Sequence, residues 1–265
     1  MMIEKENLQR ILELNKQIDD EINSIVKKDF SGLYDDNINI IQNINLKMEE
    51  DFNIIKYPIN NNELGGFVYK TDNNLFCFIN SHQPRNFQNF VLIHEYYHMS
   101  HHDNLEKNKI DTVLLNEEES INLIERKANY YASLMLLDSL RENYNKFIKD
   151  RKFTLEDTIC YLIDLYKVPK KTILIRLYEL ECITFDELYD NFNNNIENLQ
   201  NRFNKLGLDT SILEPSNVVK FDDIDKEFKK ARESGAMLES FLDQNESYYR
   251  ELLKSLEVKF KNGQR

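Results

Sequence analysis

The sequence contains few of the residues that interrupt regular structure or crosslink a chain. Its 265 residues include six glycines, four prolines and three cysteines. So few turn-forming residues exclude an all-β fold built from many short strands. Cys77, Cys160 and Cys182 are odd in number, widely spaced and outside any CxxC pair. They exclude a disulfide framework or a zinc knuckle and predict reduced thiols in the cytoplasm.

Long apolar runs and an excess of positive charge are also missing. The longest apolar stretch, from about Tyr130 to Leu137, is far too short to span a bilayer, and residues 1–7 do not resemble a signal peptide. The 46 acidic residues outnumber the 34 basic ones, which gives a formal net charge of −12. This charge argues against a broad nucleic-acid-binding surface. We therefore expect a soluble cytoplasmic protein that neither enters a membrane nor binds nucleic acid directly.

Most of the chain shows apolar residues at helical spacing. This periodicity predicts helices over 1–30, 86–102, 116–136, 138–149, 155–166 and 170–181. Between about 52 and 81 the pattern changes to short apolar runs separated by turn residues, with a bend expected at Gly65-Gly66. The sequence predicts a predominantly helical α+β fold with a small antiparallel sheet.

The five histidines all lie between positions 82 and 102. Two of them belong to the HExxH motif His94-Glu95-Tyr96-Tyr97-His98, within a predicted helix. A spacing of four residues places both imidazoles on one helical face, where they can bind one metal ion, while Glu95 points about 100° round the helix. The motif predicts His94 and His98 as metal ligands and Glu95 as the general base.

A catalytic zinc site usually needs a third protein ligand. His101 and His102 lie about 10 to 12 Å along the helix axis from His94, too far to reach the same ion. The next predicted helix places Glu125 on its apolar stripe, where a carboxylate needs a charged partner or a metal. We therefore predict Glu125 as the third ligand, and Glu117 to Glu119 as solvated charges at the start of that helix.

Asn129 follows Glu125 by one helical turn and shares its face. Histidines that bind a metal usually donate their other ring proton to a fixed acceptor, which orients the ring. Asn129 is therefore predicted to accept the Nδ1 proton of a ligand histidine.

The two helices together resemble the ImmA/IrrE family of zinc metallopeptidases over about residues 35–185. The resemblance is carried by Ile79-Asn80-Ser81, Arg85, Phe90, the HExxH motif, and the pattern Glu125-x-x-Ala128-Asn129-x-Tyr131-Ala132. It implies a zincin-like core, one zinc ion, and limited proteolysis of a helix-turn-helix transcriptional repressor. Departures from the family pattern are Tyr97 for glycine, Asn89 for arginine and Asp138 for proline.

The expected organisation is an N-terminal helix (1–34), the metallopeptidase core (35–150), a helix-turn-helix-like segment (151–185) and a helical extension (186–265). In the core, zinc would lower the pKa of water and polarise the scissile carbonyl, while Glu95 would carry the proton to the leaving amine. The sequence leaves open which side chain stabilises the oxyanion. The candidates are Tyr96, Tyr97, Tyr130, Tyr131 and Arg176.

Other interpretations concern single segments. The helix pair at 154–180, with Lys170, Lys171 and Arg176, has the outline of a DNA-binding motif, so a DNA-binding regulator is an alternative, as is a metal-binding protein without turnover. The strand at 75–79 would either hold a substrate strand or be buried. Zinc is the metal that the resemblance implies, but the sequence leaves open the choice between zinc and manganese, and the oligomeric state is not predicted.

The extension carries two apolar stripes, one over 188–206 and one over 237–260, which predict two long helices. The stripes would either form a stabilising cap or select a protein partner. We predict that a chain ending at residue 185 keeps its zinc and loses recognition of its partner.

Overall fold

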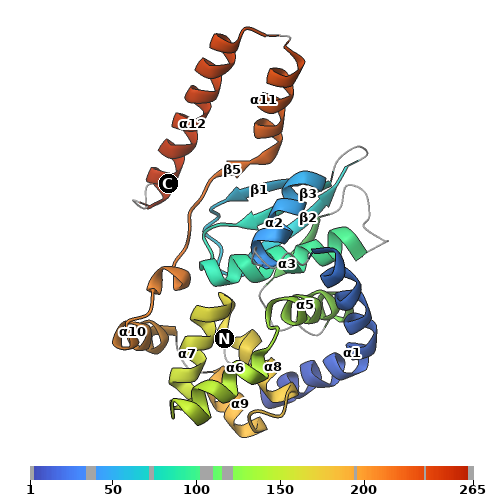
Figure 1. Cartoon of the computed structure of the whole chain (residues 1–265), viewed down its shortest axis with the longest axis vertical. Helices are drawn as coiled ribbons and strands as arrows, with labels where there is room; N and C mark the ends of the chain where they lie inside the picture. Colours follow the sequence, from blue (N-terminus) through green and yellow to red (C-terminus); the bar gives the residue numbers. More distant parts are fainter. Residues whose placement is uncertain are drawn as a thin grey trace.

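The computed structural model describes residues 3–33, 40–71, 75–101, 110–114, 122–193, 196–235 and 237–261. A five-stranded sheet is covered by helices on the side that carries the predicted metal ligands, and a helical hairpin projects from the opposite end (Figure 1). The structure confirms a predominantly helical α+β fold. Among the described residues, no helix is both long and apolar enough to cross a membrane.

The helices of the first half are α1 (Lys5–Leu33), α2 (Ile40–Asp51), α3 (Arg85–His101) and α5 (Leu123–Leu136). The second half contains α6 (Leu140–Asn145), a π-helical turn (Lys146–Asp150), α7 (Leu155–Tyr166), α8 (Lys170–Glu179), α9 (Phe185–Phe192), α10 (Ile196–Leu206), a short 3₁₀ helix (Thr210–Leu213), α11 (Asp222–Ser234) and α12 (Glu239–Lys261). The strands are β1 (Asn53–Tyr57), β2 (Leu64–Lys70), β3 (Leu75–Asn80), β4 (Ile110–Leu114) and β5 (Lys220–Phe221).

The sheet has the strand order β4-β2-β3-β1-β5, and it is mixed. β2 and β3 form the predicted antiparallel hairpin, but β1 pairs with β3 in parallel. The prediction of a purely antiparallel sheet was therefore wrong, because β1 adds to the edge of β3 that the hairpin leaves open. The expected bend at Gly65-Gly66 was wrong too. Both glycines lie within β2, where the pairing with β4 shifts register as in a β-bulge.

Asn80 fixes the connection between β1 and β2 to the end of β3. Its buried side chain donates to the backbone carbonyls of Ile59, Asn61 and Leu64, and its Oδ1 accepts from the amides of Ile59 and His82. These bonds satisfy backbone groups that no strand pairs. They position the start of β2, the strand on which the central part of α3 packs.

Helix α5 begins later than predicted. Asn122 has extended backbone angles, and its side chain accepts a hydrogen bond from the amide of Ile124, so it caps a helix that starts at Leu123. The predicted residues Glu117, Glu118, Glu119 and Ile121 lie outside the described part of the chain. Ile124 is exposed rather than buried, whereas Glu125, Ala128, Tyr131 and Met135 do form the buried face.

One large core joins the N-terminal helix, the two motif helices and the first part of the C-terminal extension. Leu188, Phe192 and Phe203 of the extension pack into it. The predicted helix over this stretch is instead two helices, α9 and α10, because the run of asparagines from 193 to 195 has low helix propensity. The first half of the extension is therefore part of the main core.

The second half of the extension forms a separate unit. α11 and α12 make an antiparallel hairpin that is linked to the sheet by β5 and stands away from the main body (Figure 1). Val219, Tyr249 and Leu253 form a small core of their own, against which Tyr57 of β1 packs. The predicted stripe over 237–260 is helical as expected, with only part of it buried.

Candidate metal centre

Two helices bring the predicted metal ligands together. α3 supplies His94 and His98, and α5, which packs along α3, supplies Glu125. The Nε2 atoms of the two histidines are 3.0 Å apart. The carboxylate of Glu125 lies between them, with Oε2 3.0 Å from Nε2 of His94 and Oε1 3.4 Å from Nε2 of His98. All three side chains are buried.

This arrangement has the size of a metal site. The three ligand atoms lie within 4.8 Å of one another. Zinc with ligand bonds of about 2.0 to 2.1 Å in tetrahedral geometry separates its ligand atoms by about 3.3 Å. Two imidazoles and one carboxylate are also a donor set that catalytic zinc sites use. The group of three therefore fits a metal ion in both spacing and chemistry.

Asn129 explains why a cation belongs at this point. Its Oδ1 lies 3.1 Å from Nδ1 of His94, so Nδ1 donates its proton and the neutral ring directs the lone pair of Nε2 toward Glu125. A lone pair facing a carboxylate is repulsive unless a cation separates them. Burial lowers the pKa of His94 and thus disfavours a proton there. A metal ion satisfies both groups, and the predicted contact of Asn129 with a ligand histidine is present.

The charge state of Glu125 is consistent with this role. Burial acts against its charged form, but when His94 and His98 carry protons, their hydrogen bonds and charges outweigh burial and lower the pKa of Glu125 well below its usual value. A metal ion at the same place would supply that positive charge while both rings stay neutral. Glu125 is therefore a carboxylate at neutral pH. A deprotonated oxygen is the form that binds a metal.

Glu95 lies on a different side of α3 from the two histidines. It is completely buried, and its Oε1 lies against Gly66 of β2, where an added Cβ would be only 2.9 Å away. The structure thus places Glu95 between α3 and the sheet, while His94 and His98 face α5. Gly66 was expected only as part of a bend, and its contact with Glu95 depends on the packing of α3 on β2.

The tyrosines considered for the oxyanion have other contacts. The hydroxyl of Tyr130 donates to Asp19, and that of Tyr131 donates to Asp29, with distances of 2.5 and 2.6 Å. Both acceptors belong to α1, so these hydroxyls attach α5 to the N-terminal helix. Tyr97, the departure from glycine, is buried with its ring 5.2 Å from that of Tyr131.

The other histidines also acquire partners. His101, at the end of α3, places Nε2 2.6 Å from Oδ2 of Asp29, the same oxygen that Tyr131 contacts. His82, which follows β3, is half-buried, and its Nδ1 lies 3.2 Å from Oδ1 of Asn217. His102 lies outside the described residues. Neither Asp19 nor Asp29 could be identified from sequence, because both act from a helix about 70 to 110 residues away.

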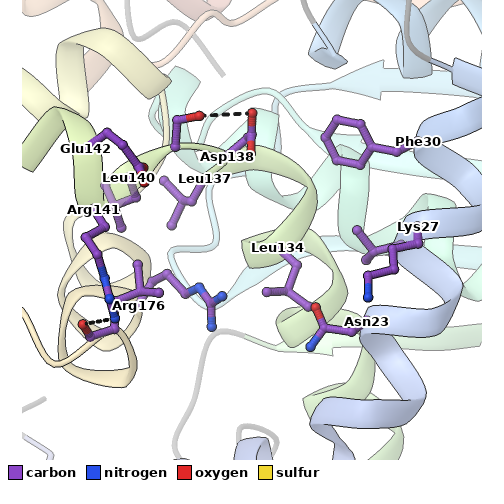
Figure 2. Close-up of a pocket in the computed structure, with 13 residues that line it drawn as sticks. Asn23, Lys27, Phe30, Leu134, Leu137, Asp138, Leu140, Arg141, Glu142 and Arg176 are labelled. Atoms are coloured by element: carbon purple, nitrogen blue, oxygen red, sulfur yellow. Dashed lines mark hydrogen bonds between the residues drawn. The ribbon is translucent and has the colours of Figure 1, made fainter.

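The basic residues of the helix-turn-helix-like segment do not share one exposed face. Lys171 lies over the ring of Phe192, and burial lowers the pKa of Lys170. Arg176 binds Glu179 and Tyr130 and points into a cavity of about 800 Å³ between α1, the end of α5, α6 and α8 (Figure 2). This cavity lies at the opposite end of α5 from Glu125. Arg176 is thus not placed as an oxyanion donor.

Strand β3 is buried rather than open to a substrate strand. β2 pairs with one of its edges and β1 with the other. Both rows of backbone groups are already in the sheet, so a peptide cannot add to β3. The interpretation of residues 75–79 as a buried strand is correct.

A comparison with protein families agrees with the geometry of α3 and α5. Residues 48–178 match the family model described as the IrrE N-terminal-like domain, peptidase family M78. These residues belong to that family. The IrrE N-terminal-like domain contains both motif helices, and its family points to metallopeptidase activity. No curated protein and no solved structure matches the chain.

The limits of the match show which parts of the chain lie outside the IrrE N-terminal-like domain. The match begins within α2 and ends within α8, so it leaves out α1 and everything from α9 onward. The contacts of Asp19 and Asp29 with α5 therefore come from outside the matched region. The same is true of the projecting hairpin.

Proposed function

We propose that the chain is a zinc-dependent endopeptidase. The observation that carries this proposal is the convergence of His94, His98 and Glu125 within one buried cluster, on the two helices of an IrrE N-terminal-like domain. When bound there, zinc would act as a Lewis acid toward water and the scissile carbonyl. Zinc rather than manganese is part of the proposal, supported by the two nitrogen ligands.

In the proposed reaction each residue of the chain has one task. His94, His98 and Glu125 hold the ion, and Asn129 keeps the His94 ring oriented through its Nδ1 proton. Glu95 accepts a proton from the attacking water and delivers it to the nitrogen of the leaving amine. Its burial against Gly66 limits the positions that its carboxylate can take.

We further propose that the substrate is a helix-turn-helix transcriptional repressor. This part of the proposal rests on the resemblance of the motif helices to the ImmA/IrrE family. The proposed cut is a single one in the repressor, which would make the peptidase an anti-repressor.

The test uses purified full-length protein and the repressor encoded beside its gene. We expect one cut in the repressor with zinc present, and none after chelation until zinc is returned. Glu95→Gln should bind zinc as the wild type does but cleave about 10²- to 10⁴-fold more slowly, because an amide cannot accept the proton. Glu125→Ala should lose zinc, whereas Glu142→Ala, an exposed glutamate on α6, should retain it. Cleavage by Glu95→Gln at the wild-type rate would refute its role as base.

A further inference from the structure

The outer face of α12 exposes a row of large apolar side chains. Phe241 is 54% exposed, Tyr248 69% and Leu252 46%, and Leu238 at the start of the helix is 78% exposed. The face about 100° round α12 is already used, because Leu242, Tyr249 and Leu253, each one residue after a member of the row, are buried in the hairpin. The exposed row is therefore not needed to attach α12 to the rest of the chain.

The row has the spacing of a helix–helix seam. Its positions alternate steps of three and four residues, through Leu238, Phe241, Asn245, Tyr248, Leu252 and Ser255. This is the spacing of the a and d positions of a coiled coil. A single polar residue within such a seam sets register and orientation at some cost in stability, and Asn245 occupies that place.

The order of residues along the row favours a second copy of α12 running in the opposite direction. If a twofold axis passes between Asn245 and Tyr248, Phe241 of one copy faces Leu252 of the other, and the same pair forms again on the other side. Asn245 then faces the hydroxyl of Tyr248 in the second copy. The Nδ2 atom of Asn245 donates to the carbonyl of Phe241, and its Oδ1 can accept that hydroxyl. The row is thus complementary to itself.

Charge supports the same orientation. Residues 237–246 contain three acidic residues and no basic one, whereas residues 247–261 contain four basic residues and two acidic ones. Glu239, Asp243 and Glu246 bind Arg232 of α11, so they act on a second copy only through the net charge of each end. A parallel pair would bring the two acidic ends together, and an antiparallel pair brings each acidic end to a basic one. Val258, 54% exposed near the basic end, then lies toward Met237 and Leu238 of the other copy, which are also exposed.

We propose that α12 forms a symmetric antiparallel homodimer through this row of residues. The hairpin projects from the main body, so two copies of α12 can approach without contact between the metal centres (Figure 1). Each α12 would then pack on its own α11 by one face and on the second α12 by the neighbouring face, about 100° round the helix. The result is an assembly of four helices in which the two copies of α12 contact each other.

The experiment measures the mass of the full-length protein by light scattering and sedimentation equilibrium. The wild type should have twice the 31.7 kDa mass of the single chain. Phe241→Glu and Leu252→Glu should each raise the dimer dissociation constant at least about tenfold, because each places two charges in an apolar seam. Ser247→Glu adds the same charge at an exposed position of α12 beside the row, and it should remain dimeric.

A pair of double variants tests the orientation. In an antiparallel dimer, Phe241→Glu combined with Leu252→Lys places each new carboxylate opposite a new ammonium group, so dimerisation should recover relative to Phe241→Glu alone. Phe241→Glu combined with Leu252→Glu should not recover. A wild type that stays monomeric at its highest soluble concentration overturns the proposal. So does equal dimerisation of Phe241→Glu and Ser247→Glu, and failure of the Glu–Lys variant to recover overturns the antiparallel arrangement.

Discussion

The carboxylate of Glu95 lies against Gly66 so closely that a Cβ at position 66 would come within 2.9 Å of Oε1. The same Cβ would lie 2.6 Å from the carbonyl oxygen of Phe78 and 2.7 Å from Cγ1 of Val91. Glycine at this point lets α3 approach β2 at the position of Glu95. The proposed base is therefore positioned by a strand as well as by its own helix.

Gly66→Ala should disturb Glu95 directly. The backbone oxygen of Phe78 belongs to the paired strand β3 and cannot yield, so β2 must shift against Val91 and Glu95 of α3, and we expect a loss of about 1 to 3 kcal/mol in the free energy of unfolding. Cleavage should fall by on the order of 10²-fold, the effect of misplacing a catalytic group by about 1 Å. Zinc content should stay close to that of the wild type, because His94 and His98 face α5.

Gly235→Ala is the matched control for this substitution. A Cβ at Gly235 meets nothing within 4 Å, but the backbone there has φ of +62°, so alanine costs about 1 to 2 kcal/mol through strain alone. Both variants should therefore lose stability, and only Gly66→Ala should lose cleavage when both are assayed fully folded. Equal turnover in the two variants would show that Gly66 does not position Glu95.

Much of the candidate site could be predicted from sequence because its geometry is local. His94 and His98 are one helical turn apart, so their common face follows from the helix alone. Glu125 was identified because its carboxylate shares one helical face with apolar residues that were expected to be buried. Glu125 is indeed buried, although Ile124, which was assigned to the same apolar stripe, is exposed. Asn129 followed from Glu125 by the same helical spacing.

What could not be predicted depends on contacts between distant segments. The parallel pairing of β1 with β3 requires knowing which edge of the hairpin is open, and no local pattern gives that information. Gly66 was interpreted as a turn residue, since a bulge in a strand and a bend have the same composition. The role of Asp29 could not be recognised from sequence, because it is one of many charged residues on an amphipathic helix.

Asn129→Ala should weaken zinc binding without removing a ligand. Nδ1 of His94 loses its acceptor at 3.1 Å, and the ring is then free to adopt other orientations or the other tautomer. We expect zinc affinity to fall about 10- to 100-fold, measured by competition with a chelator. Asn129→Asp retains an acceptor oxygen and should bind zinc at least as tightly as the wild type. A similar loss in both variants would contradict an orienting role.

Asp29 should make the stability of the protein sensitive to acid. Burial acts against its charge, but the hydrogen bonds of His101 and Tyr131 and the charges of His101 and Lys28 outweigh burial and lower the pKa of Asp29. A carboxylate with a lowered pKa stabilises the folded state above its ordinary pKa of about 4, and this contribution is lost as the pH falls through the folded-state value.

The measurement is urea unfolding of Asp29→Asn and wild type at several pH values. At pH 7 the variant should be less stable by about 1.5 to 3 kcal/mol, the range for hydrogen bonds to a charged group. This difference should shrink as the pH is lowered below about 4, because the wild type then loses the same charge. Asp20→Asn, at an exposed position of α1, should match the wild type throughout. A difference that does not change with pH would mean that the charge of Asp29 is not responsible.

Two truncations should behave differently, because the extension contributes to two separate cores. A chain that ends at residue 185 loses Leu188, Phe192 and Phe203 from the main core. Each buried side chain of this size is worth about 2 to 5 kcal/mol, and together they approach the whole net stability of a typical domain. We expect this chain not to fold and not to retain zinc, in contrast to the expectation from sequence.

A chain that ends at Gly235 loses only α12, and thus Tyr249 and Leu253 of the small core beside β1. It should fold, bind zinc as the full chain does, and be monomeric. Zinc content by elemental analysis and cooperative unfolding decide the result: a zinc-loaded chain of 185 residues would show that the main core does not need α9 and α10.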